Sequence, residues 1–396
     1  MGTHTRQELT PPAAGASPAP VAARTWASID LAAVRHNVRE AQRLAGDGVG
    51  VAAVVKANAY GHGAVPVARA AAEAGAAALV VANAREGVEL REAGIAAPII
   101  IAGASFPSDA DAIVAHGLEP CLAPPELLEA VAEAAERRGV TARVHIMADL
   151  GMGRDGVTWG EALGLAERLH ETPRVILEGV ASHFPTADDI DTSFSEAEIA
   201  HFERLLAEIE ARGHQPRRVH LANSAALLRL PDARFNMVRA GIMLYGMAAS
   251  PVVEGMAGWR PALSWRTRVA YVRAVAAGTP IGYGHIWTAP RDTVLATLPV
   301  GYHDGYLRCY SNNADVLLRG QRAPVVGRVS MDYTVVDTGH IPGVAVGDVA
   351  TLIGCDGDET IRAEELAERR GTIPYEVTCA IGPRVERRYG GVEGQA

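Results

Sequence analysis

A lysine at the end of an apolar run is the first residue whose position points to chemistry. Lys56 directly follows the run Val51–Val55. An amine held against apolar walls has a lowered pKa, as a lysine that condenses with a carbonyl group requires. A lysine facing solvent at the end of a strand would have the same local sequence. Four residues later, the segment 60–63 (Tyr-Gly-His-Gly) offers a phenol and a flexible backbone suited to an anion.

Groups that could contact a cofactor stand at the ends of three later apolar runs. His183 ends the run 176–183 and could stack on or hydrogen-bond a ring, although a lone histidine is more often structural. Asn223 and Ser224 directly follow the run 218–222, and Gly241 and Ile242 end the run 236–242. Hydroxyl and backbone N–H donors at such places suit a phosphate. Together, a lysine, a tyrosine, a histidine, a serine and an arginine at successive strand ends predict a cup for a phosphorylated cofactor that bears a carbonyl group.

The elements that must position these residues are apolar runs separated by helical patterns. Segments 126–138 and 196–212 have apolar residues at three- and four-residue intervals and charges on the other face. This alternation predicts a (β/α)8 TIM-like barrel, in which functional side chains gather at the carboxyl ends of the strands. A doubly wound sheet is the alternative. The apolar runs are Val51–Val55, Ala78–Ala82, Pro98–Ala102, Leu118–Leu122, Arg143–Met147, Ile176–His183, Arg218–Ala222 and Asn236–Ile242.

The pattern along the chain divides it into three parts. Residues 1–24 are rich in Pro, Ala, Gly and Ser and predict a flexible tail. Residues 25–255 form the α/β barrel segment. Residues 256–396 predict a C-terminal all-β domain, because β-rich runs with turns and little helix follow Gly246. These runs are Arg266–Val275, Thr293–Pro299, Asp315–Leu318, Ala323–Val329, Tyr333–Asp337 and Asp348–Ile353.

Composition favours a small-molecule substrate. The formal charge of -9 argues against nucleic acid or an anionic membrane as a partner, because either would repel the average surface. Four cysteines without CxxC spacing indicate neither a metal site nor a disulfide framework. The longest apolar runs are far shorter than the roughly 20 residues of a membrane span, and no secretory signal precedes them. We therefore expect a cytoplasmic protein.

Many segments, in order, resemble the alanine racemase family of fold-type III pyridoxal-phosphate enzymes. The stretch 55–63 (Val-Lys-Ala-Asn-Ala-Tyr-Gly-His-Gly) looks like the family's cofactor-lysine motif, and Thr25–Leu31 resembles its first strand. The resemblance covers about residues 25–390. The other similar segments are Gly151–Arg154, Ser182–Phe184, Ala222–Ala225, Val238–Ile242, Gly282–Gly284, Leu298–Tyr302 and Gly327–Asp332.

The resemblance implies a racemase that interconverts L- and D-alanine. In the family the lysine, here Lys56, binds pyridoxal 5'-phosphate and moves a proton. A tyrosine of the partner subunit, matched by Tyr283, acts on the opposite face, which implies a homodimer with composite sites. An unperturbed phenol has a pKa of about 10, so a neighbour must lower it. The implied cofactor-binding residues are Lys56, Tyr60, His183, Asn223, Ser224, Arg239, Gly241 and Ile242, with Arg239 facing the pyridine nitrogen and His183 the ring.

The resemblance also implies groups for the substrate. Arg154 and the backbone N–H of Met331 match groups near the substrate carboxylate, and Tyr302 and Asp332 match the gate of a narrow entrance. No metal is expected. The chain departs from the family pattern at four positions, and these departures predict a racemase that accepts serine or larger side chains besides alanine. They are Met147 in place of an often carbamylated lysine that orients the arginine, Leu150 for threonine, His303 for a small residue, and Pro383 for a tyrosine that contacts the phosphate tyrosine.

Without that lysine, Asp149 or chloride are the candidates for orienting Arg154.

Three alternative functions share the scaffold. A racemase with another preferred amino acid differs only in substrate. A decarboxylase would release carbon dioxide and would not need Tyr283. A non-catalytic carrier of the cofactor, or a protein that sequesters an amino-acid analogue, would bind without turnover, although known carriers of this kind lack a β domain.

Overall fold

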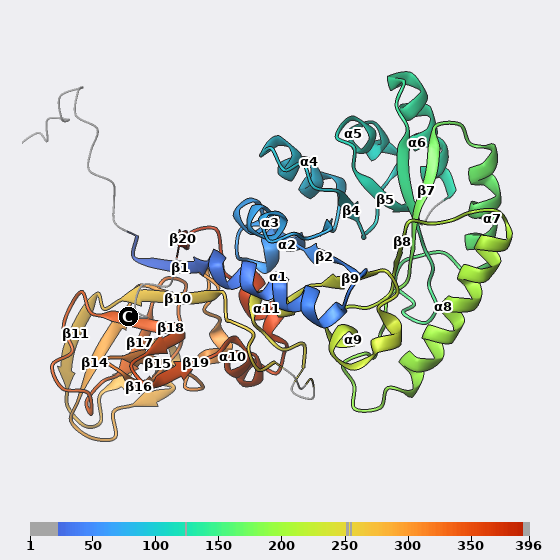
Figure 1. Cartoon of the computed structure of the whole chain (residues 1–396). Coiled ribbons are helices and arrows are strands. Elements are labelled where there is room, and N and C mark those ends of the chain that lie inside the picture. Colours follow the sequence, from blue (N-terminus) through green and yellow to red (C-terminus); the bar gives the residue numbers. More distant parts are fainter. Residues whose placement is uncertain (1–22, 123–124, 251–252, 254–255, 391–396) are drawn as a thin grey trace, which may run out of the picture.

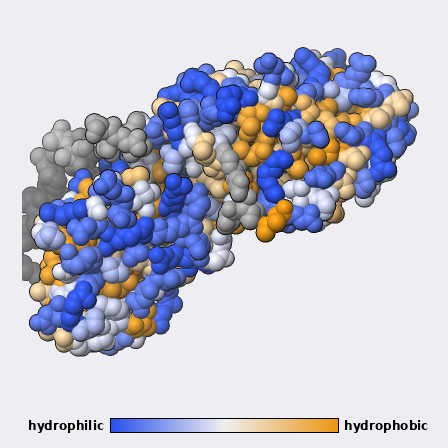
Figure 2. Space-filling model, turned by 60° about the horizontal axis from the view of Figure 1, so that its bottom comes forward, coloured by the Kyte–Doolittle hydropathy of each residue, from blue (hydrophilic) through white to orange (hydrophobic). Residues whose placement is uncertain are grey.

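The computed structural model describes residues 23–122, 125–250, 253 and 256–390. Two parts lie beside each other along an elongated molecule, a barrel ringed by helices and a sheet domain (Figure 1). The space-filling view shows an area of apolar residues on the barrel part, whereas the sheet domain is mostly hydrophilic on this face (Figure 2). No helix in the described ranges is both long enough and apolar enough to cross a membrane.

Eight parallel strands close into a barrel, which confirms the predicted fold class of the first part. The first three of these strands, β2 to β4, are almost entirely Val, Ile, Ala and Leu because both of their faces are buried, whereas later strands also carry buried polar residues. The barrel closes where β9 pairs with β2, with Ala52 opposite Arg239. The strands are β2 (Gly50–Val54), β3 (Ala78–Val81), β4 (Ile99–Ile101), β5 (Glu119–Leu122), β6 (Ala142–Met147), β7 (Val175–Ala181), β8 (Arg218–His220) and β9 (Met237–Ala240).

Helices follow the barrel strands and bury one face each against them. In α8, Ile199, Phe202, Leu206 and Ile209 recur at helical spacing and are buried. Thr158 and Glu161 form a capping box that starts α7. The helices are α1 (Leu31–Ala45), α2 (Lys56–Tyr60), α3 (Ala64–Glu73), α4 (Ala84–Glu92), η1 (Pro107–Asp109), α5 (Ala110–Ala115), α6 (Pro125–Arg138), α7 (Trp159–Glu171), α8 (Ser193–Ala211), α9 (Ser224–Arg229), η2 (Pro231–Ala233) and η3 (Ile242–Tyr245).

The first strand, β1 (Thr25–Asp30), lies in the sheet domain and not in the barrel. It pairs antiparallel with β10 and parallel with β20. Trp26 on this strand packs between the guanidinium groups of Arg268 and Arg388, which lie 5.2 and 4.7 Å from its ring. The expected barrel segment 25–255 thus includes a strand of the other domain, because sequence order does not show which sheet a short strand joins.

The C-terminal part is a sheet domain with two helices. Its largest sheet has the strand order β16-β15-β18-β10-β1-β20, with β19 paired to β18. The predicted run Arg266–Val275 divides into β10 and β11, which join different sheets. The elements are β10 (Leu263–Arg268), β11 (Tyr271–Val275), β12 (Pro280–Ile281), η4 (Tyr283–His285), β13 (Trp287–Thr288), β14 (Thr293–Leu298), η5 (Arg308–Tyr310), β15 (Asp315–Leu318), β16 (Gln321–Pro324), β17 (Thr334–Asp337), β18 (Val349–Asp356), β19 (Glu359–Ile361), α10 (Ala363–Arg370), α11 (Pro374–Cys379) and β20 (Glu386–Gly390).

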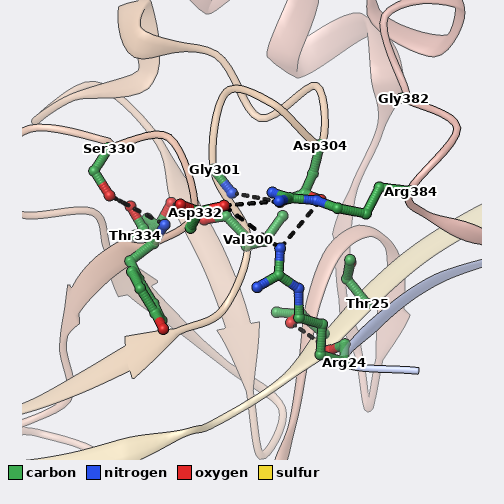
Figure 3. Close-up of polar contacts among 12 residues, drawn as sticks. Arg24, Thr25, Val300, Gly301, Asp304, Ser330, Asp332, Thr334, Gly382 and Arg384 are labelled. Carbon is green, nitrogen blue, oxygen red and sulfur yellow. Dashed lines mark hydrogen bonds and ion pairs between the residues drawn. The ribbon is translucent and has the colours of Figure 1, made fainter. Parts of the chain in front are cut away.

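The two helices correct the expectation of an all-β domain. Both helices are short; α10 packs against α11, and α11 packs against α2. Of the expected tail, residues 1–24, the first 22 lie outside the described residues. Arg24 is described, and its guanidinium lies within 3.8 Å of the carboxylates of Asp304 and Asp332 (Figure 3). The end of the expected tail therefore contacts the sheet domain.

Candidate active site

A cavity of about 740 Å³ opens at the carboxyl ends of the barrel strands. Side chains of α11 and of the segment before it complete its wall, including Ile373, Tyr375 and Cys379. The structure brings together nine of the predicted site residues here. They are Lys56, Tyr60, Arg154, His183, Asn223, Ser224, Arg239, Gly241 and Ile242.

The backbone that carries Lys56 is a left-handed turn. Ala57, Asn58 and Ala59 have φ of 52°, 53° and 52°, in the region that L-residues rarely adopt. The carboxylate of Glu86 holds this turn by accepting from the backbone N–H of Ala57 at 2.9 Å and of Ala82 at 2.7 Å. Strained backbone of this kind persists only where surrounding contacts determine it, and it concentrates at functional sites.

The electrostatic surroundings of Lys56 favour its neutral amine. Burial lowers the pKa of Lys56, and the positive charge of Arg154 lowers it further. The carboxylate of Glu86 acts in the opposite direction but does not outweigh them. A neutral amine is the form that can attack a carbonyl group or accept a proton.

The cavity lining includes a phenol, a hydroxyl and the backbone of a glycine. The backbone N–H of Gly241 donates to Ser224 Oγ at 2.8 Å. A Cβ on Gly241 would lie 2.8 Å from the Tyr60 hydroxyl, so only glycine leaves this space open. Burial raises the pKa of Tyr60, which keeps its phenol neutral and able to donate. Asn223 accepts from Ala226 N at 3.0 Å and starts α9.

The cavity lining also includes a buried cation. Arg239 on β9 is only 5% exposed. Its guanidinium donates to the carbonyl of Ser182 at 2.7 Å, to that of Leu221 at 3.1 Å and to His183 Nδ1 at 3.1 Å. Burial, followed by the charge of Arg239, lowers the pKa of His183 to about 3. His183 is therefore a neutral ring beside a fixed positive charge.

Arg154 stands at the rim of the cavity and is held by a residue that the sequence analysis did not single out. Its Nε donates to Asp155 Oδ1 at 3.1 Å. Asp149, one of the two expected partners, instead accepts from the backbone N–H groups of Gly151 and Gly153 and shapes the loop. The adjacency of Asp155 to Arg154 in the sequence was the signal that could have identified it.

Four predicted site residues lie outside the cavity of a single chain. Tyr283 in η4 is 73% exposed and Met331 is 51% exposed. Tyr302 is also exposed, and its backbone N–H donates to Ser330 O at 3.0 Å. Arg328 Nε donates to Tyr283 O at 3.1 Å, so these loops of the sheet domain are linked. One chain therefore does not bring Lys56 and Tyr283 together.

Asp332, the fourth of these residues, belongs to an ionic cluster. Arg384 lies between two carboxylates and donates to Asp304 Oδ1 at 2.7 Å and to Asp332 Oδ1 at 2.7 Å, while Arg24 approaches both from the other side (Figure 3). Asp304 in turn accepts from Gly301 N at 3.0 Å. This cluster fixes the loop that carries Tyr302.

The positions that depart from the family pattern are distributed unevenly around the site. Met147, at the end of β6, lines the cavity and is almost fully buried. Leu150 is half-buried, whereas His303 and Pro383 are exposed and lie outside the cavity of one chain. The sequence analysis missed Tyr375, whose ring packs against that of Tyr60 at a centroid distance of 5.4 Å. A second phenol thus stands beside Tyr60 although Pro383 does not supply one.

An amine with a lowered pKa, a cluster of donors that a Cβ would obstruct, and a buried guanidinium in one barrel cavity suit a phosphorylated carbonyl cofactor. These residues define a barrel enzyme of the pyridoxal-phosphate type. Comparison with known proteins agrees. The profile of the alanine racemase N-terminal domain matches residues 29–249, and that of the alanine racemase C-terminal domain matches residues 262–389.

The chain belongs to the alanine racemase family, whose members are pyridoxal-phosphate-dependent isomerases. It is 46% identical over 367 residues to the alanine racemase of Symbiobacterium thermophilum, covering 93% of this chain and 97% of the relative. A solved alanine racemase from D-cycloserine-producing Streptomyces lavendulae is 39% identical, with a TM-score of 0.90 and coverage of 94% and 99%. One from Bartonella henselae with covalently bound pyridoxal phosphate is 27% identical, with a TM-score of 0.83 and coverage of 93% and 100%.

Proposed function

We propose that the protein interconverts L- and D-alanine, with Lys56 and Tyr283 as its two proton-transfer groups. The observation that carries this proposal is the position of Lys56, a lysine amine of lowered pKa in the barrel cavity that also contains Tyr60, Ser224 and Arg239. The family of the chain supplies the reaction, and the cavity supports a place for the cofactor and for Lys56.

The cavity offers partners for each part of pyridoxal phosphate. The donors of Tyr60, Ser224, Gly241 and Ile242 would hold the phosphate, with Asn223 fixing the segment that carries Ser224. The neutral ring of His183 would pack against the pyridine ring, and Arg239 would face its nitrogen. When bound, the cofactor supplies an aldehyde for an amine and a conjugated ring that withdraws electrons from the α-carbon of the substrate.

Lys56 takes one of the two proton-transfer roles. Burial and the charge of Arg154 lower the pKa of Lys56, which favours the amine form whose Nζ can accept the α-proton on one face of the substrate. The left-handed turn fixes the Cα of Lys56, which limits the positions that Nζ can reach. Inversion then requires a second group on the opposite face, because a single base would return the proton to the side from which it came.

Tyr283 takes the second role from the partner subunit. It is exposed in a single chain and lies in loops that also carry the exposed Tyr302, Met331 and Tyr333. Clustered exposed apolar side chains mark protein contact surfaces. A homodimer that places these loops over the partner's barrel would complete two sites, with Arg154 and the backbone N–H of Met331 at the substrate carboxylate and with Tyr302 and Asp332 at the entrance.

Chiral chromatography tests the reaction. L-Alanine incubated with the protein loaded with pyridoxal phosphate should yield D-alanine, and Lys56→Ala and Tyr283→Phe should each abolish this. Tyr283→Phe should nevertheless show the absorption of bound cofactor, so its loss of activity would not come from loss of the cofactor. If the wild-type protein binds the cofactor but releases carbon dioxide or leaves alanine unchanged, the proposal is wrong.

A complementation experiment tests the composite site. Neither Lys56→Ala nor Tyr283→Phe should be active alone. Mixed dimers of the two variants contain one site with both native residues if the tyrosine acts in trans, and none if it acts in cis. Recovery of about half of the wild-type activity per mixed dimer supports the composite site. A lack of recovery in purified mixed dimers contradicts it.

Substrate range depends on what lines the cavity. Met147 is the one departing position that does so, and its flexible apolar side chain can adjust to a larger substrate. We propose that serine is a second substrate. The ratio of kcat/KM for L-serine to that for L-alanine should change in Met147→Lys, and turnover of alanine alone would contradict the broader range.

We also place the protein in the cytoplasm. All four cysteines are unpaired, and Cys309, Cys355 and Cys379 are exposed. Exposed thiols persist in a reducing compartment and oxidise outside it. Cell fractionation that recovers the protein from an oxidising compartment would contradict this assignment.

A further inference from the structure

Four buried polar side chains form a line through the interior of the barrel. His145 Nε2 lies 3.1 Å from Glu119 Oε2, and His145 Nδ1 lies 2.9 Å from His220 Nε2. His220 Nδ1 lies 2.8 Å from Arg239 Nη1. The four residues come from β5, β6, β8 and β9. The line therefore connects the amino-terminal end of β5 with the cation in the cavity.

The chemistry of Arg239 fixes the direction of every hydrogen bond in this line. A guanidinium can only donate, so His220 Nδ1 must accept and the ring proton of His220 must lie on Nε2. That proton is donated to His145 Nδ1, which places the proton of His145 on Nε2, where Glu119 accepts it. Both histidines are therefore neutral. In agreement, burial and the charge of Arg239 hold the pKa of His220 far below its usual range.

A carboxylate ends the line, and its charge is maintained at that place. Although burial raises the pKa of Glu119, the hydrogen bond from His145 and the nearby arginines outweigh burial and lower it. Glu119 Oε2 also accepts from Arg218. Hydrogen bonds that run in one direction between a cation and an anion polarise one another and strengthen together.

The neighbouring strand leaves room for the line. A Cβ on Gly179 of β7 would lie 2.3 Å from His145 Nδ1. The register between β6 and β7 also shifts between Val144 and His145. Such irregularities re-aim a side chain within a sheet. The barrel is thus shaped locally to hold the imidazole of His145 between its two partners.

We propose that Glu119 is a positioning residue for Arg239 and acts through His145 and His220. This inference rests on the proposed function, in which Arg239 faces the pyridine nitrogen. The anion keeps the two ring protons directed away from the cavity, so that the Nδ1 lone pair of His220 always meets the guanidinium. Arg239 is thereby held in one orientation, with its charge presented to the cofactor.

A second buried glutamate provides a matched control. Glu178 on β7 is also buried and also faces Arg218, at 3.7 Å, and Arg143, at 3.4 Å. Its Oε2 has no hydrogen-bond partner among the residues that the structure describes. Glu178→Met thus removes a buried charge beside Arg218 without breaking a contact to His145, whereas Glu119→Met removes both the charge and that contact.

Nitrogen-15 NMR of the histidine-labelled holoenzyme tests the proposal directly. In the wild type, His145 and His220 should each show a protonated Nε2 and an unprotonated Nδ1. Glu119→Met should change the signals of both rings, whereas Glu178→Met should leave them unchanged. Glu119→Gln retains an acceptor without a charge, so the tautomers should persist while the Nε2 protons report weaker hydrogen bonds. Gly179→Ala should disturb His145 as Glu119→Met does.

The same variants are compared for the absorption spectrum of the bound cofactor and for turnover. Glu119→Met should shift the absorption and lower kcat/KM by about tenfold or more, with Glu119→Gln between it and the wild type. A proton on Nδ1 of either histidine in the wild type would overturn the proposal, as would equal effects of Glu119→Met and Glu178→Met. If Glu119→Met does not fold, Nε2 proton signals in Glu119→Gln that report hydrogen bonds as strong as in the wild type would also overturn the proposal. The NMR readout does not depend on racemase activity, so failure of the proposed function would be recognised separately.

Discussion

The left-handed turn after Lys56 determines whether a glycine substitution there raises or lowers the free energy of unfolding. Ala57 has φ 52° and ψ 49°, a conformation that disfavours an L-residue by about 1–2 kcal/mol. Glycine removes this strain, while the greater freedom of the unfolded chain offsets about 0.4–1 kcal/mol of the gain. Ala57 is exposed, so the lost methyl group removes little packing. We expect Ala57→Gly to raise the free energy of unfolding by about 0.5–1 kcal/mol.

The control is the same change in a right-handed helix. Ala197 is exposed within α8, where Ala197→Gly should lower the free energy of unfolding by about 1 kcal/mol. Urea unfolding of the cofactor-free variants, followed by circular dichroism, compares the two. Ala57→Gly should also lower kcat/KM, because a relaxed turn holds Lys56 less firmly. If both glycine variants lose stability equally, the strain assigned to the turn does not exist.

Three further perturbations follow from the site. Tyr60→Phe keeps the ring packing against Tyr245 and Tyr375 but removes a hydrogen-bond donor. The Kd of pyridoxal phosphate should therefore rise about tenfold, with an unchanged free energy of unfolding. Equal affinity in a fluorescence titration would contradict the role of Tyr60 in holding the phosphate. Burial lowers the pKa of His62 to about 4, so the folded state binds fewer protons than the unfolded state between pH 6.5 and 4, and stability falls as pH falls; His62→Gln should remove up to about 3 kcal/mol of that dependence in urea titrations. Arg239→Lys leaves hydrogen-bond acceptors unpaired and should lower the free energy of unfolding in urea titrations by about 2 kcal/mol. An unchanged free energy of unfolding would show that the guanidinium group is not needed for stability.

The barrel could be predicted because its strands are buried on both faces and stand out as apolar runs. The sheet domain was harder to predict, since its strands are short and half-exposed. β1 joins β10 and β20 through pairings that no local pattern shows. The helix α10 was missed although its sequence, Ala363–Arg370, is rich in helix formers, and α11 was missed because it has only six residues.

The candidate site followed from polar residues at strand ends, a position that the sequence displays. Residues that act from inside an apolar run were missed. His145 and His220 sit within the predicted strands, and only the closed barrel shows that they face each other. The left-handed turn at 57–59 was also hidden, because alanine is a helix former and nothing local favours a positive φ. Asp155 was missed although it adjoins Arg154 in the sequence, and Tyr375 was missed because its contact with Tyr60 joins positions 315 residues apart.

The pairing of β1 with β10 has a consequence for the order of folding. Thr25 and its hydrogen-bond partner Arg266 are 241 positions apart. During synthesis the first strand emerges early and stays unpaired until the whole barrel segment has followed, because both of its neighbours, β10 and β20, are made later. Closing so long a loop is slow unless the barrel folds first and brings the ends together. The barrel thus acts as a folded insertion within the sheet, and an isolated C-terminal domain would expose the edges of β10 and β20 to aggregation.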